Sequence, residues 1–189
     1  MKYNIRRWNP LLIAIPDIGI GMMWGSLGNV VAFFGYTFTN SAADIAKIYS
    51  LAAIVGVFTQ VVVGVLSDKT KHRWGKRSPW LVFGMVGAAI SIALWPLATN
   101  FMMFLIMTGV TCTLVNVAQC AYYTMVMEVV DADQVGYANT LARTTAAVGG
   151  LFMGGLAGFL WNSQHPEFTF FAMAAIMATK RMTAAISTG

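Results

Sequence analysis

Long apolar stretches separated by short polar segments dominate the pattern of this chain. A helix needs about 20 mostly apolar residues to cross a bilayer. Stretches that satisfy this rule lie at 11–38, 45–66, 80–98, 101–127 and 137–161. A sixth stretch, at 168–179, meets Lys180 and Arg181 too early to span. The pattern therefore predicts an all-α membrane protein with five full spans and a truncated sixth helix.

The segments between the spans predict a single bundle without a separate soluble domain. The loops at 39–44, 99–100 and 162–167 are short, and short loops make neighbouring helices pack antiparallel. We expect one transmembrane bundle over 1–179, followed by an atypical tail at 180–189 that loses the apolar pattern. This change of character predicts a truncation or a frameshift, so that the chain is a fragment.

The composition excludes a water-soluble protein. Soluble domains carry about 25% charged residues, whereas this chain has 10% charged and 58% hydrophobic residues. Cys112 and Cys120 lack Cys-x-x-Cys partners, and we find neither a cluster of metal ligands nor a Ser-His-Asp or nucleotide-binding motif. We therefore expect no enzymatic activity, no cofactor and no metal.

The formal net charge of +5 comes mainly from two basic clusters. They lie before the first span and between the second and third spans, and contain Lys2, Arg6, Arg7, Lys69, Lys71, Arg73, Lys76 and Arg77. An even number of spans separates them, so both lie on one side, with only Lys47, beside the first loop at the start of the second span, opposite. The positive-inside rule puts that side in the cytoplasm. We expect a plasma-membrane protein with a cytoplasmic N-terminus that contacts lipids and does not bind nucleic acid.

The segment between the second and third spans is the most informative, with the sequence GVLSDKTKHRWGKRSPW over residues 64–80. Gly64 permits close approach of helices, and Asp68 can pair with basic neighbours or with the N-terminus of a helix in another bundle. Basic side chains here can bond helix-end carbonyls or lipid phosphates. The residues expected to form a conformational gate are Gly64, Asp68, Arg73, Gly75, Lys76 and Arg77. An ordinary basic loop that only sets topology is the alternative.

This segment resembles the signature loop of the major facilitator superfamily, between its second and third helices. Its ending, Trp-Gly-Lys-Arg-Ser-Pro-Trp, is similar to that of the glycoside–pentoside–hexuronide:cation symporters and the sucrose transporters. The resemblance implies the six-helix N-terminal half of a twelve-helix fold over roughly residues 11–178. It also implies that a missing C-terminal half, or a second copy of this chain, is the partner.

A second segment, 128–139, resembles the loop that joins the fourth and fifth helices in the same families. Glu128 and Arg143 flank this loop, and we expect a salt bridge between them that steadies the gate, with direct coupling as the alternative. Glycines follow at four-residue spacing on the fifth span, at Gly150, Gly154 and Gly158. Such spacing favours close packing within the bundle, and dimerisation is the competing use.

Candidate substrate and proton groups lie on the first span. An ionisable residue inside a span is costly and therefore suggests function. Asp17 is the candidate that exchanges a proton or pairs with a cation, and Trp24, on the same helical face, offers an apolar plate to a sugar ring. The structural alternatives are that Asp17 reaches the interface and that Trp24 packs against a neighbour.

A polar stripe runs along the fourth span and must face a cavity or another helix rather than lipid. It contains Thr108, Thr111, Cys112, Asn116, Gln119 and Tyr123. Asn116, Gln119 and Tyr123 can hydrogen-bond the hydroxyls of a neutral sugar, and hydrogen bonding between helices is the alternative.

The resemblance also bears on the coupling ion. Sodium-using members of the symporter family carry carboxylates on the second helix, where this chain has Gly56 and Gln60. The resemblance therefore implies a proton rather than sodium. We expect a secondary active transporter that moves a sugar or glycoside with protons by alternating access. An efflux transporter of the same fold and a truncated membrane protein that transports nothing are the alternatives.

Overall fold

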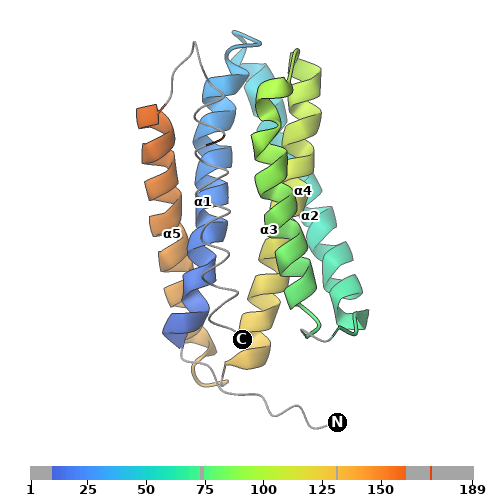
Figure 1. Ribbon diagram of the computed structural model, residues 1–189, viewed down its shortest axis with the longest axis vertical. Coiled ribbons are helices and arrows are strands. Elements are labelled where there is room, and N and C mark those ends of the chain that lie inside the picture. The colour runs from blue at the N-terminus through green and yellow to red at the C-terminus, as the bar shows by residue number, and fades with distance from the viewer. Residues whose placement is uncertain (1–9, 73–74, 131, 161–170, 172–189) are drawn as a thin grey trace.

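The computed structural model describes residues 10–72, 75–130, 132–160 and 171, and the regular elements in these ranges are all helical. The long helices are α1 (Pro10–Gly35), α2 (Ala42–Lys69), α3 (Ser78–Ala93), α4 (Phe101–Val129) and α5 (Val135–Leu160). A short 3-10 helix, η1 (Trp95–Leu97), follows α3. Figure 1 shows the helices side by side along the long axis of the molecule. The predicted tail at 180–189 lies outside the described residues, as does the sixth span at 168–179 apart from Phe171.

Polar residues at the helix ends explain where the helices begin. The side chain of Asn100 accepts a hydrogen bond from the backbone N–H of Met103, at 2.8 Å, and so caps the start of α4. In the first turn of α2, Asp44 accepts a hydrogen bond from Thr39 Oγ1 at 3.0 Å and pairs with Lys47 at 2.6 Å. An acidic group at this end also interacts favourably with the helix dipole.

Helix α3 is shorter than the continuous 80–98 span expected from hydropathy. It has 16 residues, and the chain then turns at Leu94 into η1, which contains Pro96. Proline lacks a backbone N–H and its ring clashes with the preceding turn, so an α-helix does not continue through it without a break. By length and composition, three helical segments of the described residues can cross a membrane: Asp17–Gly35, Ala42–Lys69 and Phe101–Glu128.

The α1–α5 pair forms the most extensive helix contact of the described residues. Glycines allow it: a Cβ added at Gly21 would lie 1.9 Å from the carbonyl oxygen of Ala146, and one at Gly25 would lie 2.3 Å from that of Gly150. The contact is thus within the bundle, as expected for Gly150. Further along the predicted glycine row, Gly154 meets the side chain of Asn29 on α1, and a Cβ at Gly158 would find no described atom within 4 Å.

The main core cluster collects buried apolar residues from all five long helices and from η1. Phe104 of α4 makes edge-to-face contacts with Phe34 and Trp95, at centroid distances of 5.2 and 5.5 Å. Trp95 and Phe104 are fully buried. Large apolar side chains such as Phe58 of α2 and Phe83 of α3 are instead exposed, which suits a surface that faces lipid.

The close α1–α5 contact gives a first prediction. Gly21→Ala forces a methyl group against the backbone of Ala146, and overpacking of this kind costs about 1–3 kcal/mol. We expect the melting temperature in detergent to fall by about 2–4 °C for each kcal/mol. Gly28→Ala on the same helix is the matched control, because a Cβ there has no described atom within 4 Å. Equal melting temperatures for the two variants would contradict the glycine contact.

Candidate functional site

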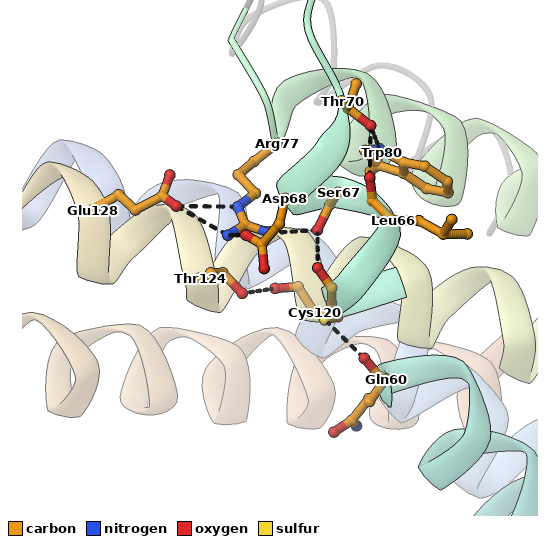
Figure 2. A network of polar contacts seen from close by, with 11 residues as sticks. Gln60, Leu66, Ser67, Asp68, Thr70, Arg77, Trp80, Cys120, Thr124 and Glu128 are labelled. Carbon is orange, nitrogen blue, oxygen red and sulfur yellow. Dashed lines mark hydrogen bonds and ion pairs between the residues drawn. The ribbon is translucent and has the colours of Figure 1, made fainter. Parts of the chain in front are cut away.

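Arg77 joins the ends of α2 and α4. Its guanidinium donates hydrogen bonds to Ser67 and Asp68 at the end of α2 and, at 3.0 and 3.3 Å, to Glu128 at the end of α4. Figure 2 shows Arg77 between these acceptors. We call Ser67, Asp68, Arg77 and Glu128 the latch. Because Arg77 directly precedes α3, the latch ties together the ends of three helices.

The latch places a buried cation between carboxylates that solvent reaches. The Arg77 side chain is 6% exposed, whereas those of Asp68 and Glu128 are 65% and 45% exposed. Burial alone would lower the pKa of Arg77, but the bonds and charges of Glu128 and Asp68 outweigh it and raise the pKa above its ordinary value. Arg77 therefore stays protonated throughout the physiological pH range.

The loop around the latch has its own constraints. Gly75 has a φ of +96°, in the left-handed region that glycine adopts at no steric cost. The indole N–H of Trp80 donates to Thr70 Oγ1 at 2.9 Å and holds the start of α3 beside the end of α2. Lys76 is exposed, and Arg73 lies outside the described residues. The loop thus presents Lys76 outward and turns Arg77 inward.

One expectation for this region is corrected, and the role of Gly64 stays a prediction, since a Cβ there would find no described atom within 4 Å. Glu128 pairs with Arg77, and Arg143 stacks instead on the ring of Tyr123, 4.2 Å from its centroid. The reason is geometric: Arg143 lies eight residues into α5, about 12 Å along its axis, and is therefore level with Tyr123 rather than with Glu128 at the end of α4.

Asp17 lies at the centre of a second polar cluster, between α1, α4 and α5. Its side chain is fully buried. Tyr123 donates its hydroxyl to Asp17 Oδ2 at 3.4 Å, while Oδ1 has no hydrogen-bond partner among the described residues. Arg143 covers the face of the same tyrosine ring. A buried carboxylate needs a compensating cation or a proton, and this cluster can provide either.

A pocket of about 400 Å³ opens between α1, α2 and α4. Its lining comprises Trp24, Tyr49, Ala52, Ala53, Gly56, Val57, Gln60, Asn116 and Gln119. The volume falls in the range of about 300–1,000 Å³ that is typical of small-molecule sites. Aromatic and amide side chains here alternate with small residues, so the pocket offers both a flat apolar surface and hydrogen-bonding groups.

Hydrogen bonds connect the walls of this pocket. Trp24 Nε1 donates to Gln119 Oε1 at 2.8 Å and links α1 to α4. Gln60 Nε2 donates to Asn116 Oδ1 at 3.1 Å and links α2 to α4. Tyr49 donates its hydroxyl to the carbonyl of Gly28 at 2.8 Å and links α2 to α1. Each wall is therefore positioned by a bond to another wall.

The structure divides the residues that the sequence assigned to substrate binding. It brings Trp24, Asn116 and Gln119 together in the pocket, and places Tyr123 in the Asp17 cluster. Another member of the predicted stripe, Thr111, bonds Ser91 and Trp95 and is structural.

The sequence interpretation did not identify Tyr49 as a pocket residue. It considered Gln60 only because a glutamine stands where sodium-using symporters carry a carboxylate. Tyr49, Gly56 and Gln60 follow at i, i+7 and i+11, a spacing that places them on one helical face. That spacing was the available signal.

Comparison with known proteins gives a consistent picture. A family model described as "MFS/sugar transport protein" matches residues 12–187 of the chain. An uncharacterized symporter of Synechocystis is 30% identical over 67 residues, which are 33% of this chain and 12% of that protein. The aligned part thus spans about an eighth of the length of the curated relative.

The latch gives a second prediction. Arg77→Ala removes hydrogen bonds to charged partners, each worth about 1.5–3 kcal/mol, and leaves two carboxylates side by side. We expect a lower melting temperature and faster labelling of Cys120 by a membrane-permeant maleimide, since the thiol of Cys120 on α4 bonds the backbone carbonyl of Gln60 on α2. Arg77→Lys should restore the stability only in part, because an ammonium group lacks the planar fork.

Lys76→Ala, at the exposed neighbouring position, is the control and should leave the melting temperature and the rate of Cys120 labelling unchanged. Buried Cys112 serves as an internal reference for the labelling. Unaltered stability and labelling in Arg77→Ala would show that the latch does not hold α2 and α4 together.

Proposed function

The chain belongs to the MFS/sugar transport protein family, and from this premise we propose that it forms part of a proton-coupled symporter for a sugar or glycoside. The members of this family are transporters, and the apolar helices are those of a multi-pass membrane protein. Alternating access in such proteins moves one bundle against another around a central site. The proposal assigns a separate role to each of the three polar features of the bundle.

The observation that carries the proposal is the pocket between α1, α2 and α4. Trp24 is 37% exposed and presents an indole to the open space, while Gln119 and Gln60 bring amide groups to the same space. Sugars have apolar ring faces and polar hydroxyl edges, so a site for them needs an aromatic surface and neutral hydrogen-bonding groups. We assign Trp24, Asn116 and Gln119 to substrate binding on this basis.

Asp17 is the proposed proton carrier. It is buried, one of its oxygens has no partner among the described residues, and Tyr123 and Arg143 connect it to α4 and α5. Protonation would remove the negative charge of Asp17 and with it the electrostatic attraction of Arg143 toward this junction. A change of charge at this junction can therefore alter how α1, α4 and α5 pack.

The latch is the proposed gate, on the cytoplasmic side of the plasma membrane. Its bonds join α2, α3 and α4 at one end of the bundle, so breaking them permits that end to open. On α5, Arg143 lines an open hollow with Asn139, Thr140 and Thr144. Such a polar surface does not face lipid, and we propose that a second bundle, either a C-terminal half or a second copy, covers it.

The proposed function is tested by uptake into proteoliposomes. The coding sequence around this chain is first read in all frames for further apolar spans, and the complete product is then reconstituted. Accumulation of a labelled neutral glycoside, driven by an imposed proton gradient, is the expected result. Export of dyes without sugar uptake would favour the efflux alternative, and no movement of any solute would favour a protein that does not transport.

A third prediction concerns Trp24. Trp24→Ala removes the aromatic surface and the bond to Gln119, and we expect binding of the transported glycoside to weaken by about tenfold, or 1.4 kcal/mol. Phe58→Ala is the matched control, since Phe58 is an exposed aromatic residue on α2 that does not line the pocket. Equal affinities for the two variants, measured by equilibrium binding, would remove Trp24 from the site.

A fourth prediction concerns Asp17. Asp17→Asn keeps the size of the side chain and an acceptor for Tyr123, but it cannot exchange a proton. We expect accumulation under a proton gradient to fall to simple equilibration, while exchange of labelled for unlabelled sugar persists. Asp133→Asn, in the exposed turn before α5, is the control. Gradient-driven accumulation by Asp17→Asn at the normal level would exclude Asp17 as the carrier.

A further inference from the structure

We infer that the pocket between α1, α2 and α4 selects uncharged polyhydroxylated ligands and rejects sugars that carry a carboxylate, phosphate or ammonium group. The inference rests on the proposed function and narrows its substrate class. It follows from two properties of the pocket: the absence of charge in its lining, and the hydrogen-bonding groups that remain free once the internal bonds are made.

The lining of the pocket is uncharged. Among its residues, only Tyr49 is ionisable, and the others are aliphatic, amide, glycine or tryptophan residues. The charged groups of the Asp17 cluster lie at a different height along the bundle axis from the pocket. Asp17 precedes Trp24 by seven residues, about 10 Å along α1, and Arg143 is stacked on Tyr123. An ionic ligand in the pocket would therefore lose water without gaining a partner of opposite charge.

The orientation of the Gln119 amide follows from its partner. An indole N–H can only donate a hydrogen bond, so the Gln119 atom that lies 2.8 Å from Trp24 Nε1 must be the amide oxygen. The Gln119 amide nitrogen is thereby left with its two hydrogens for a ligand. Gln119 acts as a donor in the pocket.

The orientation of Gln60 follows in the same way, through Asn116. A backbone carbonyl can only accept, so the Asn116 atom that bonds the Cys112 carbonyl at 2.8 Å must be the amide nitrogen. The Asn116 oxygen then accepts from the Gln60 amide nitrogen at 3.1 Å. The remaining atom of the Gln60 amide is its oxygen, and Gln60 acts as an acceptor in the pocket.

Tyr49 is a second acceptor. Its hydroxyl hydrogen is used on the Gly28 carbonyl, at 2.8 Å, which leaves the oxygen lone pairs for another group. The pocket therefore offers donors from Gln119 and acceptors from Gln60 and Tyr49. A hydroxyl both donates and accepts, so several hydroxyls on one ring can satisfy this set. A carboxylate or phosphate cannot donate to the two acceptors, and an ammonium group cannot accept from Gln119.

The test is a binding competition with ligands that differ in one substituent. The full chain is reconstituted in nanodiscs, and a labelled neutral methyl glycoside is displaced by the unlabelled glycoside, by the corresponding uronate or by the corresponding amino sugar. We expect both charged ligands to bind at least about tenfold more weakly than the neutral one, since each leaves polar groups unsatisfied.

Gln119→Glu should reverse the discrimination against the amino sugar. The new carboxylate still accepts from Trp24 Nε1, but it replaces the donor with a negative charge, so the amino sugar should gain at least about tenfold relative to the neutral glycoside. Gln134→Glu makes the same chemical change in the exposed turn before α5 and should leave the selectivity of the wild type. If Gln119→Glu does not fold, Gln60→Glu introduces the same charge at the acceptor position.

The outcomes separate the inference from the proposed function. Binding of the neutral glycoside, the uronate and the amino sugar within threefold of one another would overturn the selectivity and leave a sugar-binding pocket in place. Tighter binding of a charged sugar than of the neutral one would also overturn it. Failure of every sugar to bind would refute the pocket as the substrate site, and the inference with it.

Discussion

Polar side chains within a bilayer have no water to satisfy them, so each must find its partner inside the protein. The described helices meet this constraint by bonding across helix pairs. Trp24 bonds Gln119, Gln60 bonds Asn116, and Tyr49 bonds the carbonyl of Gly28. The same bonds hold the bundle together and determine which polar atoms remain for a ligand. In this bundle, stability and recognition therefore depend on one set of contacts.

Helix α1 is central to this arrangement because its two faces contact different helices. One face has glycine at positions 21 and 25, and the missing side chains at Gly21 and Gly25 allow the backbone of α5 to contact that of α1. The adjacent face carries Asp17 and Trp24, which bond α4. Close packing of α5 therefore brings Arg143 within reach of the Tyr123 ring, where it lies beside the only hydroxyl that bonds Asp17 among the described residues.

Hydropathy was enough to predict the five long helices of the described residues, apart from the early end of α3, because apolar runs of sufficient length have few alternatives in a membrane protein. It could not predict how helices that are distant in sequence meet. Glu128 and Arg143 are close in sequence, yet Glu128 bonds Arg77, which is 51 residues away. Asn116 and Gln119 could be assigned from their polar spacing. The spacing of Tyr49 could show which helical face it shares with Gln60, but not its bond to the carbonyl of Gly28 on another helix. The break of α3 was readable in principle from Pro96.

The latch has one cation and two carboxylates, and this inequality has an evolutionary consequence. Asp68 and Glu128 each supply a negative partner to the same guanidinium, so the loss of one leaves Arg77 neutralised by the other. Arg77 has no such substitute among the described residues. The carboxylates are therefore mutually redundant, and drift can sample changes at either of them singly. Arg77 is therefore the position of the latch at which substitutions should be tolerated least.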